Sequence, residues 1–345
     1  MKKTINIIVK IISVLIAFSL LTMLFMPKYI EKNTDGRITA EYYREKTPID
    51  VIIAGSSIVH AGVSPMTMYR EYGISAYDRS NSSQVVPISY AMIMDSIKRN
   101  KPRLVVMDVG FLYQSDDYVD EGSSRKSMDS FKWSKYKSEC IKDIMDESES
   151  YIDYVFPILR FHSRWNDLKT EDIKYLLYKP TITYNGQLLQ FGTDGKNAEF
   201  NQRMLNESVK ATDRTMNYLE KINKGCKDNG VNLLFIKMPV IEGNWNNTID
   251  NQIVEFSKAN NINYINFVND FEKIGLDKNT DFVDGQHMNS YGAEKFSKYL
   301  SEILVSEYDI KDNRSDVKIK TVFDEKLSRY EEAMKEQRPT EPVSD

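Results

Sequence analysis

Two short stretches, far apart in the chain, carry residue types that suit nucleophilic catalysis. The first is Gly55-Ser56-Ser57, and the second is Asp284-Gly285-Gln286-His287. A serine hydroxyl is a weak nucleophile at neutral pH, so it needs a base within hydrogen-bonding reach. That base in turn needs a third group that holds its tautomer. Ser57, His287 and Asp284 therefore form a candidate catalytic triad.

The small number of histidines narrows the choice of base. The chain has three, at positions 60, 162 and 287. His60 follows the serines closely, on the helix that they are expected to begin, and His162 has no carboxylate nearby in a loop arrangement. His287 has Asp284 within a few residues, which favours it as the base. The alternative interpretation is that Asp284 and His287 only cap the helix that follows them.

The elements expected around both stretches would place them where such a site lies in open α/β sheets. The run 50–54 is apolar and rich in β-branched residues, and it ends at Gly55, so the serines are expected at the carboxyl end of a strand. Open α/β sheets place their sites at that edge. After the histidine, Asn289 and Ser290 are candidate N-caps, and apolar residues recur at helical spacing over 293–304. The second stretch is thus predicted to be a loop leading into the last helix of the domain.

The two stretches resemble motifs of the SGNH/GDSL hydrolase superfamily, and within it the membrane-anchored, DltD-like branch of bacterial cell-envelope acyl-transfer proteins. In that family the nucleophile is the serine of a Gly-Asp-Ser or Gly-Ser-Ser block, which corresponds to Ser57. The family's closing Asp-x-x-His block matches Asp284 and His287, and the similarity extends over 281–292. The resemblance covers residues 48 to 305, approximately.

Two positions depart from the family pattern. Ser56 stands where Gly-Asp-Ser has its aspartate, as in the DltD-like branch, and it is a candidate substrate contact. No Gly-x-Asn-Asp block follows the third expected strand, so the asparagine that the family uses in its oxyanion hole is missing from its usual place.

Other donors must then stabilise the oxyanion, because losing one donor costs about 100- to 1000-fold in rate. The backbone N–H of Ser57 is one candidate, and the N–H of Ser83 is the second, with Ser82 and Asn81 as alternatives. A Ser/Asn cluster before a helix, expected here over 87–99, is also ordinary turn and cap chemistry.

A third cluster suits the binding of an anionic or sugar-containing polymer. It lies within 157–165, a string that resembles one in proteins of the DltD-like branch, and its candidate residues are Arg160, His162, Arg164 and Trp165. Arginines pair with phosphate, and tryptophan stacks on ligands. The alternative is an amphipathic helix whose arginine and tryptophan side chains pack on a core.

Strand and helix signals alternate along the chain, which predicts an α/β fold with a parallel sheet. Strands are expected near 50–54, 74–77, 103–109, 231–238 and 262–267. The resemblance implies an SGNH-type, flavodoxin-like, three-layer fold with about five parallel strands. A helical, aromatic insertion at about 114–200 is expected to lie over the active-site edge.

The ends of the chain differ in character from the middle. Residues 1–27 form a predicted transmembrane anchor, with a cleaved signal peptide as the alternative, and 28–47 form a linker. The catalytic domain is expected over 48–310. The charged tail, 311–345, is predicted to hold an exposed helix near 325–336 and then to be disordered.

The composition limits the classes of partner that the chain is expected to bind. The chain has 345 residues and a net charge of −4, which argues against nucleic acid as a partner. No cofactor is expected, and no cluster of metal ligands is evident. Cys140 and Cys226 are treated as free, although they are able to pair in an oxidising compartment.

The resemblance implies a membrane-anchored, extracytoplasmic serine esterase or O-acyltransferase that acts through an acyl-enzyme. The acyl group would be acetyl or D-alanyl and the acceptor a teichoic acid or a surface polysaccharide. The implied partners are an acylated small-molecule or protein donor, the cell-envelope polymer and a membrane-bound O-acyltransferase. The alternatives are an esterase that deacetylates carbohydrate with water, and a non-catalytic accessory subunit of an acyl-transfer complex.

Overall fold

A five-stranded parallel sheet forms the centre of the protein. The computed structural model describes residues 2–26, 34–112, 120–177, 182–198, 209–243 and 245–336. Within these ranges the strands are arranged in the order β2-β1-β3-β4-β5, which is the flavodoxin-like doubly wound order. Their bounds are β1 Val51–Ala54, β2 Ala76–Asp78, β3 Leu104–Asp108, β4 Asn232–Lys237 and β5 Asn263–Asn266. The predicted α/β fold with about five parallel strands is confirmed.

Burial of both faces explains why the central strands read as continuous apolar runs. Every residue of β1 and β3 is buried, as expected for parallel strands that are covered by helices on both sides. Alternate residues enter two separate cores: Ile52 and Val105 belong to one, and Ile53 and Val106 to the other. The parallel register pairs Ala54 with Met107, so the segments after β1 and β3 emerge at the same edge.

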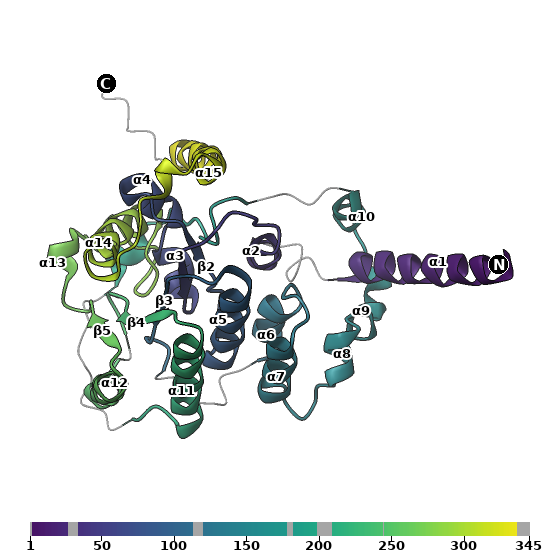
Figure 1. Ribbon diagram of the computed structural model, residues 1–345, viewed down its shortest axis with the longest axis horizontal. Helices are drawn as coiled ribbons and strands as arrows, with labels where there is room; N and C mark the ends of the chain where they lie inside the picture. The colour runs from purple at the N-terminus through teal and green to yellow at the C-terminus, as the bar shows by residue number, and fades with distance from the viewer. Residues whose placement is uncertain are drawn as a thin grey trace.

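Helices form the two outer layers (Figure 1). The first core includes residues of α5 (Val86–Asn100), α11 (Asp213–Asp228) and α12 (Asn247–Asn260). The second core includes residues of α3 (Ser57–Gly62), α13 (Phe271–Ile274) and α14 (Ser290–Tyr308). Helix α4 (Pro65–Tyr72) contributes to both. The three layers therefore match the expected architecture.

The insertion after β3 is helical, as predicted, but most of it lies away from the edge that carries Ser57. Helix α7 packs on α5, while α9, η2 and α10 contact α1 (Figure 1). The elements are α6 Glu121–Met128, α7 Lys135–Ile144, α8 Tyr151–Val155, α9 Ile158–Phe161, η2 His162–Asp167, α10 Thr170–Leu177 and η3 Asp194–Asn197. Among its described residues, the end of the insertion reaches the site, where the Leu188 N–H donates to the His60 carbonyl and Asn289 Nδ2 donates to the Gly192 carbonyl. Parts of the insertion, such as 114–119, lie outside the described residues.

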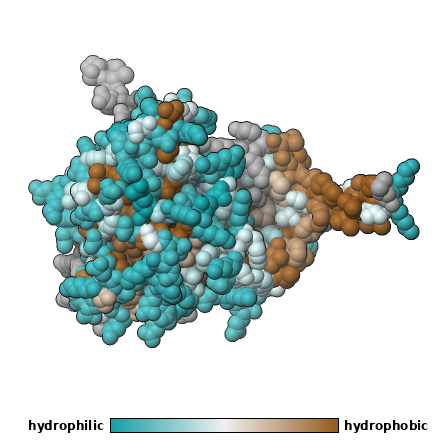
Figure 2. Space-filling view, viewed as in Figure 1, coloured by the Kyte–Doolittle hydropathy of each residue, from teal (hydrophilic) through white to brown (hydrophobic). Residues whose placement is uncertain are grey.

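Helix α1 (Lys2–Phe25) projects from the domain with its apolar side chains exposed (Figure 2). It is long and apolar enough to cross a membrane, and a signal sequence near an N-terminus meets the same criterion. In this structure none of its residues is buried. A surface of this kind needs an apolar surrounding other than water.

The segment predicted to be a linker, 28–47, instead supplies part of the core. Helix α2 (Thr34–Tyr42) buries Ile38 and Tyr42 one helical turn apart. The guanidinium carbon of the buried Arg79 lies 3.7 Å from the centre of the Tyr42 ring. The linker interpretation is therefore corrected for residues 34–47, because an apolar face hidden among charged residues packs against the domain. Residues 28–33 lie outside the described ranges.

The charged tail is likewise part of the domain up to residue 336. Helix α15 (Val317–Glu336) buries one face through Ile319, Phe323, Tyr330 and Met334, so the prediction of an exposed helix is wrong for that face. Residues 337–345, which were expected to be disordered, lie outside the described residues.

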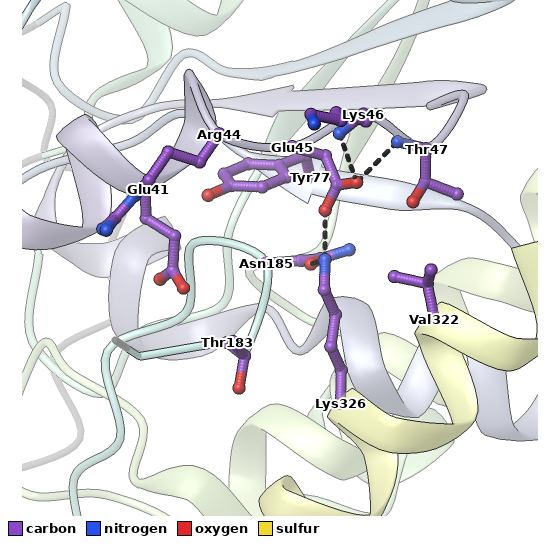
Figure 3. Close-up of a pocket in the computed structure, with 10 residues that line it drawn as sticks. All are labelled: Glu41, Arg44, Glu45, Lys46, Thr47, Tyr77, Thr183, Asn185, Val322 and Lys326. Atoms are coloured by element: carbon purple, nitrogen blue, oxygen red, sulfur yellow. Dashed lines mark hydrogen bonds and ion pairs between the residues drawn. The ribbon is translucent and has the colours of Figure 1, made fainter. Parts of the chain in front are cut away.

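A cavity of about 410 Å³ lies between α15, the segment after α2 and β2 (Figure 3). Lys326 of α15 forms an ion pair with Glu45 across it and donates to Asn185 Oδ1 at 2.7 Å. Burial opposes ionisation of Glu45, but Lys326 and the hydrogen bonds from Thr47 together outweigh burial and lower the pKa of that carboxyl. The pair therefore fixes the C-terminal helix to the start of the domain.

Candidate active site

Ser57 is the first residue of α3, directly after the turn that ends β1. A side chain at Gly55 would place its Cβ 2.4 Å from Val59 Cγ2 and 3.2 Å from Asp108 Cβ, so the turn is built for glycine. At the start of α3 the N–H groups of Val59 and His60 donate to the Ser56 carbonyl, whereas those of Ser57 and Ile58 have no acceptor among the described residues. The serine hydroxyl is thus presented at the carboxyl edge of the sheet beside unpaired backbone donors.

The structure brings Ser57, His287 and Asp284 together from opposite ends of the domain. His287 Nε2 lies 2.8 Å from Ser57 Oγ. On the other side of the ring, His287 Nδ1 lies 2.9 Å from Asp284 Oδ2 and 3.0 Å from Asp284 Oδ1. With the Nδ1 proton donated to the carboxylate, Nε2 is left to accept the serine proton.

A rigid loop holds the aspartate and the histidine. Asp284 Oδ1 accepts the N–H groups of Gln286 and His287, each at 2.8 Å. The Val283 N–H donates to the His287 carbonyl, and the Gly285 carbonyl accepts two N–H groups from the segment after β4. The base is therefore fixed through its backbone as well as its ring.

Asn289 resolves the alternative interpretation of this loop. Its Oδ1 accepts the N–H groups of Tyr291 and Gly292, so it is the N-cap of α14. The hydrogen bonds of Asp284 are to Gln286 and His287, outside the helix. Capping of α14 thus leaves the side chains of Asp284 and His287 available to each other and to Ser57.

Electrostatics keeps the aspartate ionised. Partial burial raises the pKa of Asp284, but the hydrogen bonds from the His287 ring and from the Gln286 and His287 N–H groups outweigh it and lower this pKa to about 2. The side chains of His287 and Asp284 are 24% and 55% exposed. Both side chains therefore reach solvent.

The loop after β2 contains two unpaired amides. The Ser82 N–H donates to Asn81 Oδ1 and the Gln84 N–H donates to the Asn81 carbonyl. The N–H groups of Asn81 and Ser83 have no acceptor within the described part of the chain. Ser83 has a φ of 54°, in the left-handed region, so its backbone turns sharply relative to the neighbouring residues. Ser83 and Ser57 thus remain the predicted oxyanion donors.

Sequence reasoning missed the role of His60, which is fully buried on α3. His60 Nε2 lies 3.6 Å from Asp35 of α2, and His60 Nδ1 lies 3.8 Å from Asp78 at the end of β2. These distances are those of ion pairs rather than hydrogen bonds. Burial lowers the pKa of His60, but the two carboxylates outweigh burial and raise it to about 9. The sequence signal was the histidine's place one turn after the nucleophile.

A second buried pair lies under the nucleophile turn. Asp108, whose Cβ would touch a side chain at Gly55, accepts the N–H groups of Gly110 and Met238. Burial raises its pKa, although Lys237 opposes this. Burial also lowers the pKa of Lys237, whose Nζ donates to the Met238 carbonyl. The sequence signal for this buried pair is a lysine at the end of an apolar strand.

The candidate polymer-binding cluster lies elsewhere. Arg164 Nη1 donates to the carbonyls of Phe25 and Met26 at the end of α1, and Arg160 pairs with Glu121. His162 Nδ1 contacts the Leu159 carbonyl, and Trp165 is exposed on η2. The structure therefore places these residues beside α1 and does not bring them to Ser57. Ser56, the other candidate contact, is buried next to the nucleophile.

Two further features bear on the chemistry. The described residues contain no group of three or more His, Cys, Asp or Glu side chains that could hold a metal ion. Cys140 and Cys226 are both buried and free. The cavity of Figure 3 is lined by none of the triad residues, so the open surface at Ser57 is the candidate reaction site.

Comparisons with known proteins give the following likenesses. No protein-family model and no curated protein sequence matches the chain. Similar solved structures include a GDSL-like lipase from Bacteroides thetaiotaomicron, with 13% identity, 79% of this chain and 98% of that chain covered, and a TM-score of 0.37. A proposed acylhydrolase from Bacteroides fragilis has 12% identity, covers 77% of this chain and 94% of its own, and has a TM-score of 0.37. A proposed lipolytic protein of the G-D-S-L family from Desulfitobacterium hafniense has 11% identity, coverages of 74% and 99%, and a TM-score of 0.37.

Proposed function

We propose that this chain is a serine esterase or O-acyltransferase, tethered to a membrane by α1, that acts on an acylated cell-envelope polymer. The observation that carries the proposal is the continuous contact from Ser57 Oγ through the His287 ring to the Asp284 carboxylate. A nucleophile, a base and an orienting group within hydrogen-bonding distance are what serine-dependent acyl transfer requires. The motifs that resemble those of SGNH/GDSL hydrolases support the same reading.

The first half-reaction forms an ester on the enzyme. His287 Nε2 takes the Ser57 proton while Oγ attacks the carbonyl carbon of the acyl donor. The N–H groups of Ser57 and Ser83 stabilise the oxygen that becomes negative. The intermediate collapses, the bond to the leaving alcohol breaks, and His287 gives that alcohol its proton. An acyl-Ser57 ester remains.

The second half-reaction releases the acyl group to a hydroxyl. His287 takes a proton from the incoming hydroxyl, whose oxygen attacks the acyl-Ser57 carbonyl, and the proton returns to Ser57 as the intermediate collapses. A polymer hydroxyl as acceptor gives O-acyl transfer, with acetyl or D-alanyl as the acyl group and teichoic acid or surface polysaccharide as the polymer. A membrane-bound O-acyltransferase is the proposed source of the acyl group.

Hydrolysis is a second candidate, because one observation favours it. The side chains of Asp284 and His287 are partly exposed, so water reaches the acyl-enzyme as readily as a polymer does. The exposure also suits an extended substrate that cannot enter a deep pocket. The two functions share every step until the acceptor arrives.

One experiment tests the function and separates these acceptors. The purified full-length protein is incubated with an aryl acetate, with and without teichoic acid or polysaccharide from an unacylated cell wall. Release of the aryl alcohol reports acylation of the enzyme, and acetate found on the polymer reports transfer. Acetate found only in solution when polymer is present makes the protein a hydrolase.

Two variants make the result specific to the site. Ser57→Ala should show no turnover, and Ser56→Ala should retain it, because the hydroxyl hydrogen-bonded to His287 Nε2 is that of Ser57. Turnover by Ser57→Ala equal to the wild type, together with correct folding by circular dichroism, would contradict the proposal.

A further inference from the structure

We propose that the helices of the insertion form a membrane-contact face, which lies in the interface of the lipid bilayer beside α1. The face consists of the large apolar side chains exposed on α8, α9, η2 and α10 and on the residue that follows α8, namely Ile152, Phe156, Leu159, Trp165, Ile173 and Leu177. The occupant is the lipid of the same membrane that α1 crosses. The inference goes beyond the proposed catalysis and does not depend on it.

The exposure of these side chains is the first observation. Leu159, Trp165 and Ile173 are 48%, 65% and 56% exposed, respectively. Figure 2 shows the hydrophobic surface of α1 continuing onto the domain at the place where α8 to α10 lie in Figure 1. Soluble domains rarely leave such apolar surface in one place unless something covers it. Continuity with α1 identifies lipid as that cover.

The depth of the face follows from its contacts with α1. The Phe156 ring lies 6.1 Å from the Phe18 ring, edge to face. Phe18 is seven residues before Phe25, where α1 ends, which corresponds to about 10 Å along a helix axis. If α1 spans the bilayer, Phe156 is therefore held level with the apolar part of the span. Interfacial helices bury their apolar faces to a similar depth, about 5–10 Å.

Arg164 fixes the face in this position. Its Nη1 donates to the carbonyls of Phe25 and Met26 at 2.6 and 2.7 Å, and its Nη2 lies 3.6 Å from Asp172 of α10. A cation at the C-terminus of a helix is favourable because the carbonyls there carry partial negative charge. Buried Met26 packs with Phe161 of α9. The insertion and α1 are thus joined as one unit.

The chemistry of the side chains matches an interface rather than a dry protein contact. Trp165 is amphipathic, and tryptophan is enriched at the level of lipid headgroups. Ile173 and Leu177 share one face of α10, since they are four residues apart, while Tyr175 and Asp172 of the same helix are buried. Ile173 and Leu177 are 56% and 88% exposed, so the described part of the chain leaves this face of α10 largely uncovered.

The consequence is a fixed height and tilt for the catalytic domain. A single helix followed by a flexible spacer would let the domain turn freely. Contact through α8 to α10 instead adds a second attachment, so that Ser57 is held at a constant orientation to the membrane surface.

The test uses the full-length protein in vesicles of phosphatidylcholine and phosphatidylglycerol. Single cysteines are introduced as Ile173→Cys or Trp165→Cys and labelled with an environment-sensitive fluorophore. Cys140 and Cys226 are buried, and burial raises the pKa of each thiol, so they react slowly. Leu15→Cys in α1 is the positive control, and Val317→Cys, an exposed apolar position on α15, is the matched negative control.

Lipid brominated along its acyl chains should remove roughly half or more of the emission at positions 173 and 165, because a face at interfacial depth lies within reach of the bromines. It should leave Val317→Cys unchanged, while iodide in the buffer should quench only that position. Quenching at 173 and 165 no stronger than at 317 would overturn the proposal and leave the face to a protein partner or a second copy. Absence of quenching at Leu15→Cys would overturn it as well, since α1 would then lie outside the bilayer. Reaction of Ser57 with a phosphonate, unchanged in every variant, keeps this outcome separate from the proposed catalysis.

Discussion

Asp284 serves His287 in two ways at once, through its side chain and through the turn that it closes. One carboxylate accepts the ring Nδ1 proton, and its Oδ1 also accepts the backbone N–H groups of Gln286 and His287. In the proposed reaction the ring is therefore oriented before substrate arrives, which avoids a reorganisation cost. The same hydrogen bonds stabilise the ionised form of the aspartate.

Replacing the carboxylate with an amide tests this orientation. Asp284→Asn is expected to lower kcat by about 10⁴-fold, because the amide donates to Nδ1 and selects the wrong tautomer. The control is Asp270→Asn, which removes a surface ion pair with Lys273 and should leave kcat unchanged. Steady-state kinetics on an aryl acetate measures both. A loss of less than tenfold in Asp284→Asn would show that His287 is oriented by other groups.

The lowered pKa of Asp284 predicts a pH dependence of stability. A carboxyl whose pKa is about 2 in the folded protein and about 3.9 in the unfolded chain contributes stability above about pH 4. That contribution is lost as the pH falls towards 2. The difference in Tm between wild type and Asp284→Asn should therefore be largest near neutral pH and shrink below about pH 4. A difference that grows on acidification would contradict the assignment.

At the scale of elements, α2 is the part of the fold that joins the N-terminal region to the site. Asp35 of α2 faces His60 of the nucleophile helix, and Thr39 accepts a hydrogen bond from Asn81 in the candidate oxyanion loop. Asp78, at the end of β2, faces His60 from the other side. Displacement of α2 would thus disturb both the nucleophile helix and the loop that carries Ser83.

Removing the His60 ring tests this connection. His60→Gln should cost about 3–5 kcal/mol near neutral pH, because two buried carboxylates lose their cation. The pKa of His60 is raised to about 9, so its contribution is complete below about pH 6.5 and is lost as the pH rises through 9. Urea unfolding at pH 6 and pH 10 measures this, with His162→Gln as the surface control. An equal loss at both pH values would show that the ring acts only through packing.

The strands and the triad loop were predictable from sequence because their signals are local. A β-branched run ending in glycine, and an Asp-x-x-His before a helix cap, each lie within one short window. Helices α2 and α15 were misread because their buried residues are separated by charged ones and pack against elements distant in sequence. Tyr42 packs on Tyr77 of β2, and Phe323 packs on Tyr69 of α4. The ion pairs of His60 and the hydrogen bonds from Arg164 to the end of α1 were invisible for the same reason, since their partners come from other elements.

For the whole molecule, the proposal is that α1 and the insertion set where the reaction takes place. A tether raises the effective concentration of the enzyme near a membrane-linked substrate. The folded domain, however, begins no later than α2, which buries Ile38 and Tyr42. Any release of the domain from the membrane must therefore leave residues 34–42 in place.

Truncating the chain just before α2 tests whether folding of the domain is independent of its location at the membrane. A chain that begins at Thr34 and is exported by a cleavable signal should hydrolyse an aryl acetate, because the triad is intact. It should modify the envelope polymer poorly in cells, since the tether is lost. Beginning the chain at residue 44 should in addition lower Tm strongly, because Tyr42 and its contact with Arg79 are removed. Full modification of the polymer by the released form would place the reaction away from the membrane.

Covalent labelling tests directly whether Ser57 is a nucleophile activated by His287. The full-length protein is treated with a fluorophosphonate, digested, and examined by mass spectrometry. A single covalent adduct on Ser57 is expected, formed at the same rate with a metal chelator present and at least about 10³-fold more slowly in His287→Ala. An adduct on Ser56, or no adduct on a folded protein that still turns over ester, would contradict the account.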